Sequence, residues 1–386
     1  MDIKQISSML NDVMTEVVGE SAVLLNEDLS NIVDVGSNVN ANNVDNYVKA
    51  LSNRIGKTLF NDRVYNVSVP NMIIDKWEYG SILQKVSAVA PELTVNESWN
   101  LENGSDYSPN VFYKPTVSAK YFNKAVTFEC NISFTDKQVK ESFNSVDELS
   151  AFIAMLYITI ENNINIQIDN LIHRAINNQI LETVHAEYGS NALNASSHVK
   201  AVNLLYLYNN LNDTTLTASD CLSNKSFLQF ASYTVLNYLN RIKSPSKLFN
   251  IESALRFTPS ENANLIMLSD FHNAIKCYLE SDLYNKDDVK LPESAIIPFW
   301  QGSGHDYEFN IISEVKGKLA SDNTVSVDVT GVLACIADTN AIAICNEDRR
   351  VTTHYNPRGE FYTNFYKYDC MYLNDLSENF VVFFVA

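Results

Sequence analysis

The sequence predicts an α+β protein, and three features carry this prediction. One stretch of about 40 residues keeps a helical apolar spacing, the segments on both sides of it alternate like strands, and a later block mixes both patterns. The chain has 386 residues, of which 46% are hydrophobic and 19% are charged. This composition is typical of a globular protein with roughly two to three compact units.

The net charge of −18 argues against direct binding to nucleic acid, which needs clustered lysine and arginine against phosphate. The longest apolar stretches, residues 151–160 and 380–386, are shorter than the roughly 20 residues of a membrane span. Met1 is followed by an acidic residue and a helical pattern, so we expect no signal peptide. The six cysteines are dispersed without a C-x-x-C pair, so we expect neither a disulfide framework nor a zinc site.

The first 75 residues are predicted to form helices with little core of their own. Apolar residues recur at helical spacing in two segments, which a polar, asparagine-rich linker near residues 36–43 separates. The residues that carry this spacing are Ile3, Ile6, Met9, Val13 and Val17, followed by Val44, Tyr47, Val48, Leu51 and Ile55. We interpret the block as an arm that packs on another element outside itself.

From Trp77 onward the pattern changes to strand. Residues 82–89 are rich in β-forming side chains, and two alternating runs follow at 117–122 and 126–132. Between the strands lies a stretch rich in Asn, Gly, Ser and Pro, residues 97–116. Loops of this length are uncommon inside a compact domain and usually have a function. We therefore predict a long hairpin with an extended tip.

A capping box from Ser145 to Glu148 precedes the clearest helical pattern in the chain. The apolar stripe that follows consists of Leu149, Ile153, Leu156, Ile160, Ile164, Ile168, Leu171, Ala175, Ile176 and Ile180, and Gly189 supplies the stop. A helix of this extent has about 40 residues and a length on the order of 60 Å. Polar residues from Glu161 to Asn163 exclude a membrane span, so we expect a long spine that carries other elements.

The block from about 194 to 330 is predicted to be a mixed helix and strand unit of its own. Its expected elements are a helix over 227–242, a buried strand over 264–268, a helix from Ser269 or Asp270 to Leu279, and a strand over 325–329. The chain then returns to strand patterns, and it ends with an apolar run, Phe380 to Ala386.

No constellation of residues points to a particular chemistry. Gly302-Ser303-Gly304 lacks the third glycine and the helix of a dinucleotide site, and Gly317-Lys318 lacks the rest of a P-loop. The six histidines fall on different elements without an H-x-x-x-H pair, and no G-x-S-x-G supports a nucleophilic serine. We therefore predict no catalytic, cofactor-binding or metal-binding residues, and no cofactor.

Three arginines stand out in a chain with few basic residues: Arg349, Arg350 and Arg358. One interpretation is a contact with the acidic surface of a partner. The other, given equal weight, is a set of local salt bridges with Glu347, Asp348 or Glu360. The sequence does not choose between the two.

The order of these parts resembles the major capsid proteins of tailed bacteriophages, which have the Hong Kong 97-type fold. The resemblance runs from about Trp77 onward, and it is weakest in the arm and in the block 194–330. The stretches that carry it are WEYGSILQKVSAVAPEL, SWNLENGSDYSPNVFYKPTVSAKYFNKAVTFE, TDKQVKESFNSVDELSAFIAMLY, GVLACIADTNAIAIC and RRVTTHYNPRGEFYTNFYKYDCMYLNDLSENFVVF. Their order carries the resemblance, since no single motif is diagnostic.

The resemblance implies an arm, an extended β-hairpin loop, a peripheral domain and an axial domain. The implied boundaries are 1–75 for the N-terminal arm, 76–134 for the extended loop, 135–195 for the peripheral domain with its spine helix, 196–334 for the axial insertion, and 335–386 for the C-terminal strands of the peripheral domain. Phe380 to Phe384 would form a strand in the central sheet of the peripheral domain, covered by the spine helix and apolar on both faces.

The resemblance implies no catalytic residues but a set of contacts between subunits. The candidates are Trp99, Asn103, Asp106, Tyr107, Lys114, Lys120, Arg349, Arg350 and Arg358. In some members a loop lysine forms an isopeptide cross-link with an asparagine of a neighbour; Lys114, Lys120 and Lys124 are available here, and nothing identifies the partner. Because the chain starts at Met1, we expect no loss of an N-terminal scaffolding region and hence a separate scaffolding protein.

The implied function is that of a major capsid protein, which self-assembles into an icosahedral head shell around the double-stranded DNA genome of a tailed phage. Expected partners are further copies of itself in hexamers and pentamers, a scaffolding protein, a portal and decoration proteins, with no tight DNA binding and no membrane. The protein would be made in the bacterial cytoplasm and end in the virion. The alternatives are an encapsulin-like nanocompartment shell with a host-protein cargo, and an acidic cytosolic α+β enzyme.

Overall fold

The computed structural model of the chain describes residues 10–14, 26, 69, 72–74, 83–88, 100–105, 110, 114, 117–122, 125–135, 137–138, 146–279, 294–301 and 309–386. The chain forms two compact units. Unit 1 joins Met1–Glu78, Ala125–Ile176 and Ala343–Tyr372, and unit 2 joins Tyr79–Lys124, Asn177–Ile342 and Leu373–Ala386. Each unit is therefore assembled from segments that lie far apart in the sequence.

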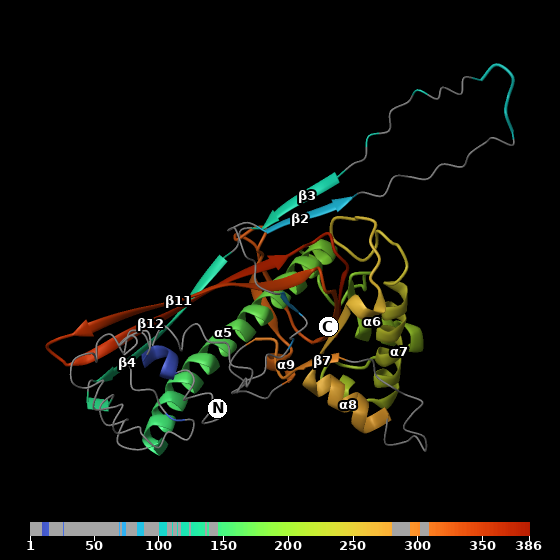
Figure 1. The fold of residues 1–386 in the computed structure, drawn as a ribbon. Helices are drawn as coiled ribbons and strands as arrows, with labels where there is room; N and C mark the ends of the chain where they lie inside the picture. Colours follow the sequence, from blue (N-terminus) through green and yellow to red (C-terminus); the bar gives the residue numbers. More distant parts are fainter. Residues whose placement is uncertain are drawn as a thin grey trace. The chain divides into compact units, whose positions relative to one another are not determined.

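The predicted long helix is confirmed as α5 (Val146–Tyr188), which has 43 residues and is continuous through both units (Figure 1). Its predicted apolar stripe is buried from Ile160 to Ile180, where no member of the stripe is more than 7% exposed. Gly189 ends the helix with a φ of +57°, and its N–H donates to the carbonyl of His185 at 2.8 Å. The predicted cap, Ser145, lies outside the described residues.

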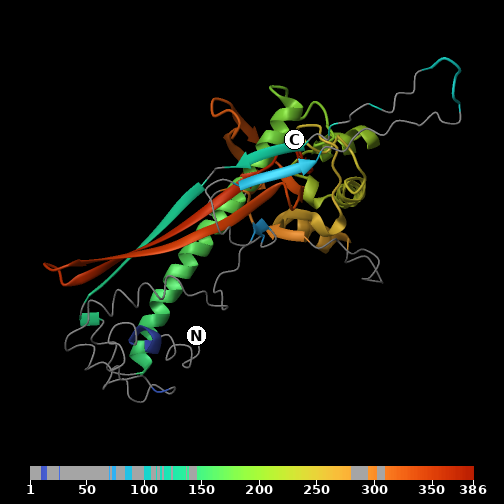
Figure 2. The ribbon, with the colours of Figure 1, turned by 45° about the horizontal axis from the view of Figure 1, so that its top comes forward.

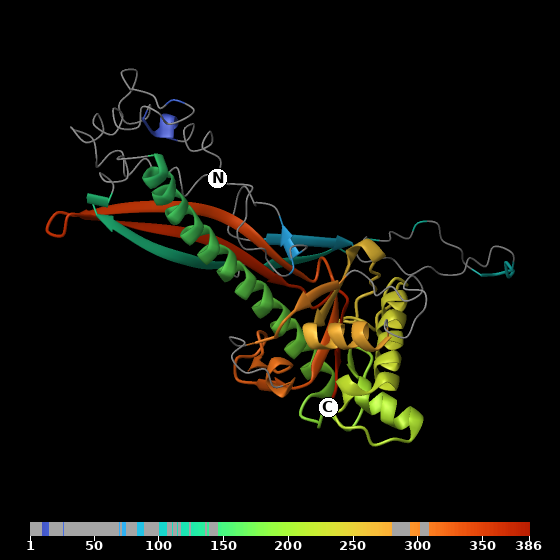
Figure 3. The same ribbon diagram turned by 90° about the horizontal axis from the view of Figure 1, so that it is seen from below.

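Unit 1 contains a four-stranded sheet in the order β1-β11-β12-β4, with α5 beside it in Figures 2 and 3. Its strands are β1 (Ile73–Ile74), β4 (Ala125–Thr135), β11 (Ile342–Asn356) and β12 (Phe361–Asn374). β4 and β12 are antiparallel, and the side chains of β12 alternate between buried and half-buried positions along most of the strand. The more exposed face carries cross-strand polar pairs, such as Lys367 with Glu129 at 3.3 Å.

Unit 2 contains a five-stranded mixed sheet in the order β5-β13-β10-β6-β7. Its strands are β5 (Ala201–Asn203), β6 (Ala263–Leu268), β7 (Ser294–Ile297), β10 (Val332–Asp338) and β13 (Phe380–Phe384). The described helices of the unit besides the end of α5 are α6 (Leu204–Asn212), α7 (Lys225–Arg241), α8 (Ser269–Leu279) and α9 (Phe309–Ile312). Two 3-10 turns, η3 (Cys221–Ser223) and η4 (Ser260–Asn262), also belong to it. Two antiparallel pairs complete the described elements: β2 (Leu83–Ala88) with β3 (Val117–Phe122), and β8 (Val315–Lys318) with β9 (Ser326–Val329).

The apolar end of the chain is a strand buried on both faces. Every residue of β13 is at most 1% exposed. The ring of Phe383 meets Tyr238 of α7 edge-on at 5.3 Å, and the ring of Phe384 meets Tyr188 of α5 edge-on at 5.8 Å. Because consecutive side chains of a strand point to opposite faces, α7 and the end of α5 cover the two sides of β13.

The strand prediction for Phe380 to Phe384 is thus confirmed. β13 pairs with β10 on one side and with β5, from the mixed middle block, on the other. The boundary predicted between residues 334 and 335 falls inside β10 (Val332–Asp338). Which strands pair in a sheet depends on contacts between segments far apart in the sequence, and a local sequence pattern carries no information about these contacts. The boundaries of the arm, the extended loop and the two named domains stay predictions.

Other elements agree with the sequence pattern where they are described. α7, α8, β6 and β9 match the predicted helices and strands of the middle block. In the arm, residues 10–14 are helical, with Leu10, Val13 and Met14 buried. The second predicted arm helix, around Val44 to Ile55, lies outside the described residues.

Candidate functional site

The β2–β3 hairpin is the described part of the predicted extended loop. Its strands are antiparallel, with Leu83 opposite Phe122 and Ala88 opposite Val117. Directly opposed residues share a face and successive residues alternate, so one face carries Lys85 and Lys120 and the other carries Val86 and Tyr121. The two faces differ sharply in chemistry.

The inner face of the hairpin is bound to unit 2 by a group of charges, the hairpin charge cluster. Its members are Lys85, Lys120, Arg256, Glu252, Asp375 and Glu378. The Nζ of Lys85 lies 2.7 Å from Asp375 and 2.8 Å from Glu378. The Nζ of Lys120 lies 2.9 Å from Asp375 and donates a further hydrogen bond to Glu252. Three positive and three negative side chains balance each other.

Asp375 is the buried centre of this cluster, with its side chain 1% exposed. Burial raises the pKa of this carboxyl, but hydrogen bonds from Lys85, Lys120 and the Ser377 N–H outweigh burial and lower the pKa to about 2. For Lys120 burial alone would lower the pKa of the amino group, but its hydrogen bonds to Glu252 and Asp375 outweigh burial and raise the pKa. The paired, charged forms of both groups are therefore the stable ones.

The outer face of the hairpin is apolar and exposed. Val86 is 60% exposed, Val117 59% and Tyr121 65%. The Gln84 amide donates to the Tyr121 hydroxyl at 3.2 Å across the strands, which holds the ring on this face. A two-stranded sheet is marginally stable alone in water, so this face is suited to contact with another surface.

Residues 100–105, which lie in the predicted tip, are all exposed. The Ser105 N–H donates to the Glu102 carbonyl at 3.3 Å, and Gly104 has a φ of +97°, which favours glycine. Among the predicted contact residues, Asn103 and Lys114 are exposed. Trp99, Asp106 and Tyr107, and likewise Lys124, lie outside the described residues. Lys120, predicted to contact another subunit, has its amino group bonded within its own chain.

The three predicted arginines have different surroundings within unit 1. Arg349 pairs with Glu161 of α5 at 2.8 Å, and its guanidinium lies 5.0 Å from the Tyr368 ring centre. Arg350 pairs with Asp369 of β12 at 2.6 Å. Salt bridges of Arg349 and Arg350 therefore form with acids from other segments, while the side chain of Glu347, one of the three neighbours considered, lies outside the described residues. Arg358 is exposed in the β11–β12 turn, and none of the described residues forms an ion pair with it.

The structure brings together one set that the sequence did not suggest: Ser196, His198 and Glu187. The Ser196 Oγ lies 3.0 Å from His198 Nε2, and His198 Nδ1 lies 3.5 Å from Glu187. Glu187 is held more closely by Lys200, at 2.7 Å, and the Tyr188 hydroxyl donates to the Ser196 carbonyl at 2.8 Å. These bonds tie the loop after α5 to the helix end, so we interpret the set as structural.

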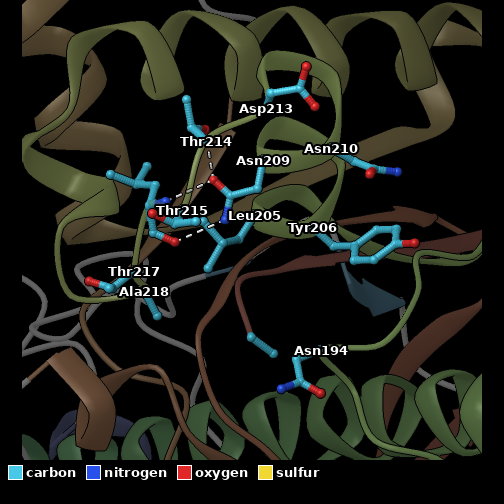
Figure 4. A pocket seen from close by; sticks show the side chains of 12 residues that line it. Asn194, Leu205, Tyr206, Asn209, Asn210, Asp213, Thr214, Thr215, Thr217 and Ala218 are labelled. Carbon is cyan, nitrogen blue, oxygen red and sulfur yellow. Dashed lines mark hydrogen bonds between the residues drawn. The ribbon is translucent and has the colours of Figure 1, made fainter.

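A pocket of about 660 Å³ with a mixed polar and apolar lining lies beside α6 (Figure 4). Its lining includes Leu205, Asn209, Asp213 and the terminal Ala386. The Asn209 side chain is fully engaged: its Oδ1 accepts from Leu216 N–H at 2.9 Å and from Thr214, and its Nδ2 donates to the Leu216 carbonyl at 2.9 Å. The amide therefore braces a loop and does not aim at a ligand.

Neither a metal site nor a membrane span is found in the part of the chain that the structure describes. No group of three His, Cys, Asp or Glu side chains among these residues could hold a metal ion. None of their helices is both long and apolar enough to cross a bilayer. All six cysteines lie among the described residues, and none of them forms a disulfide.

Comparison with known proteins gives a family and a fold. The sequence model of the family described as Phi29-like phage major capsid protein matches residues 8–384. No curated protein sequence matches the chain.

Among solved structures, a chain in the "structure of head fiber and inner core protein gp22 of native bacteriophage P68" has a TM-score of 0.52 and 10% identity, over 86% of this chain and 87% of that one. The capsid structure of Staphylococcus phage Andhra gives a TM-score of 0.49 with 11% identity over 86% and 89% of the chains. That of cyanophage P-SCSP1u gives 0.47 with 10% identity over 86% and 91%. At such identities the likeness concerns the fold alone. The P68 structure supports this likeness, because its TM-score is above one half.

Proposed function

The chain belongs to the family of Phi29-like phage major capsid proteins, and from this premise we propose how its subunits meet in the shell. As a member of that family it is a structural, non-enzymatic protein of the phage capsid and a component of the virion. The nanocompartment and enzyme interpretations are not favoured. We place the contact between subunits on the outer face of the β2–β3 hairpin and on the exposed turn at residues 100–105.

The observation that carries this proposal is the two-sided hairpin. Its inner face is fixed by charges to its own unit, while Val86, Val117 and Tyr121 are each about 60% exposed on the other face. Covering such side chains is favourable by roughly 25 cal/mol per Å² of apolar surface. A neighbouring subunit in a hexamer or pentamer is the surface available in a shell.

The charge of the chain supports a shell that encloses DNA without binding it tightly. At −18 per subunit, a lining made of many copies repels phosphate and leaves the genome free to be packed and released. The remaining assignments are part of the same proposal: synthesis in the bacterial cytoplasm, assembly with a separate scaffolding protein, a portal and decoration proteins, α5 as the spine of a peripheral domain, and residues 196–334 as an axial domain.

Introducing a charge on the outer face of the hairpin tests the contact. Val117→Lys would place an ammonium group in the proposed interface, where an unpaired polar group costs roughly 1–3 kcal/mol per contact, or about tenfold or more in association. We expect a subunit that folds normally by circular dichroism but forms few particles in sucrose gradients and negative-stain images. Leu211→Lys is the matched control, because Leu211 is 71% exposed and lies on α6, outside the β2–β3 hairpin and the 100–105 turn.

The two variants together decide the matter. Normal particles from Val117→Lys would contradict the hairpin contact. A loss of particles from both variants would show that any added charge is harmful, and the hairpin assignment would lose its support.

A further inference from the structure

The hairpin contains an arrangement that is unfavourable by itself. Lys85 and Lys120 are directly opposed in the β2–β3 register. Like charges in this position destabilise a strand pair, and the paired strands can hold both lysines only if an anion lies close to both. That anion is the Asp375 carboxylate, which accepts from Lys85 with one oxygen and from Lys120 with the other.

The Asp375 carboxylate is fixed by unit 2 independently of the hairpin. The Ser377 N–H and hydroxyl donate to its Oδ1 at 3.0 and 2.8 Å. Its own N–H donates to the Ala341 carbonyl at 2.8 Å. The turn that carries Asp375 is therefore rigid, and the carboxylate presents its two oxygens to the hairpin in a set direction.

The amino groups of Lys85 and Lys120 donate hydrogen bonds that join the hairpin to the rest of unit 2. Lys85 donates to Asp375, Glu378 and the Asn340 carbonyl, and Lys120 donates to Asp375 and Glu252. Among the side chains that the structure describes on these strands, the other hydrogen bond, from Gln84 to Tyr121, runs between the two strands. The direction of the hairpin thus depends on charge.

Among the acids of the cluster, Asp375 has a role that the others do not share. Glu378 contacts only Lys85 of the two lysines, and Glu252 contacts only Lys120 and is 45% exposed. Either pair could persist with the hairpin turned, whereas a carboxylate shared by both lysines defines one orientation. Without it, each lysine keeps its own partner while the two amines repel each other.

We propose that Asp375 is the positioning residue of the assembly hairpin: by bridging two opposed lysines, its buried carboxylate holds the β2–β3 strands in the one direction from which the outer face reaches a neighbouring subunit. This inference rests on the proposed function, in which the hairpin makes that contact. It adds that the pose of the hairpin is set by a single carboxylate inside the same subunit.

The test compares Asp375→Asn with the double variant Asp375→Asn/Lys120→Gln, both in the full chain. Asparagine keeps the size and one acceptor oxygen but removes the charge, so we expect the hairpin to loosen. Hydrogen exchange of peptides covering 83–88 and 117–122 should become at least about tenfold faster than in the wild type. Peptides covering β6 serve as the internal reference and should be unchanged. Particle yield, under the conditions that give wild-type particles, should fall by a similar factor.

The double variant separates positioning from a general structural role. Removing Lys120 relieves the repulsion between the two amines, so exchange of the paired strands should return to within about threefold of the wild type. The remaining Lys85–Glu378 pair does not set the direction of the hairpin, so particle yield should stay low. A structural defect at residue 375 would not be repaired by a change on the hairpin. Exchange that stays fast in the double variant, or a particle yield that returns to the wild-type level, would overturn the proposal.

The outcomes distinguish this inference from the proposed function. Unchanged hairpin exchange in Asp375→Asn would overturn the positioning role, while Val117→Lys could still block assembly. Faster exchange with normal particle yield would mean instead that the hairpin is not an assembly contact, and the proposal would fall with it. Should Asp375→Asn be insoluble, particle yield is measured on Lys85→Gln/Lys120→Gln, which removes both bridges; a normal yield from this variant would equally overturn the proposal.

Discussion

Deleting residues 380–386 is expected to unfold unit 2. β13 lies between β5 and β10, so its loss opens the sheet on two sides. The deletion also removes six large apolar side chains from Phe380 to Val385, none more than 1% exposed. Each contributes about 1.5–3 kcal/mol by burial, or about 9–18 kcal/mol together, against a typical total stability of about 5–15 kcal/mol. The variant should therefore be insoluble, or soluble without a cooperative thermal transition by circular dichroism.

Removing residues 100–105 is the matched control for this deletion. All six are exposed, and the one large apolar side chain among them, Leu101, is 65% exposed. Their loss takes little apolar surface from the fold, so the midpoint of thermal unfolding should stay within about 2 °C of the wild type. On the proposed function, the same variant should fail to form particles.

A single substitution measures the same core in soluble protein. Phe383→Ala removes a fully buried ring and its edge-on contact with Tyr238, which is expected to reduce the free energy of unfolding by about 3–5 kcal/mol in urea denaturation. A cooperative, soluble protein from the 380–386 deletion, or a loss of less than about 1 kcal/mol in Phe383→Ala, would refute the assignment of β13 to the core.

Three further predictions, on four substitutions, have distinct expected magnitudes. Arg349→Met leaves the nearly buried Glu161 without its partner and should lower the unfolding free energy by up to about 3 kcal/mol in urea denaturation. Arg350→Met removes a half-exposed pair and should lower it by less than about 1 kcal/mol. Equal losses from the two variants would contradict the difference in burial between the two ion pairs. The pKa of Asp375 is lowered to about 2, so the charged carboxylate stabilises the fold by about 1–2 kcal/mol above about pH 4, and this stabilisation disappears as the pH falls toward 2. The unfolding free energies of the wild type and of Asp375→Asn should therefore converge between about pH 4 and pH 2, as measured by denaturation at each pH. Gly331→Ala would place a Cβ 2.0 Å from a backbone oxygen at a φ of +76°, and it should lower the unfolding free energy by about 2 kcal/mol or more; a neutral result in thermal melts would show that the turn can relax.

The elements with strong local signals were predictable from the sequence. The stripe from Ile160 to Ile180 and the stop at Gly189 fixed α5, because helix periodicity and a left-handed C-terminal glycine are properties of neighbouring residues. Alternation identified β3 and β4 for the same reason. The apolar run of β13 indicated a doubly buried strand, since only a strand covered on both sides tolerates such a run.

The partners of these elements were not predictable, and the candidate site depends on partners. The sequence singled out Lys120 and Arg349 as basic residues in an acidic chain, but the acids that meet them, Asp375 and Glu161, are distant in sequence. Asp375 had no signal of its own. The short spacing to Ser377 indicates a turn that a carboxylate can cap, but it cannot say that two lysines from a hairpin about 255 and 290 residues away end there.

Folding and assembly rest on different forces in this subunit, and this difference follows from where each side chain lies. The sheet of unit 2 is held by apolar burial on both faces of β13, which depends little on salt. The hairpin is held by Lys85 and Lys120, whose side chains are 24% and 27% exposed, so solvent ions reach these pairs more readily than they reach the buried sheet. Conditions that weaken ion pairs therefore change the direction of the hairpin before they affect the fold. A shell subunit built in this way can stay folded while its contact surface is repositioned, because the core that keeps it folded and the charges that aim its hairpin share no side chain.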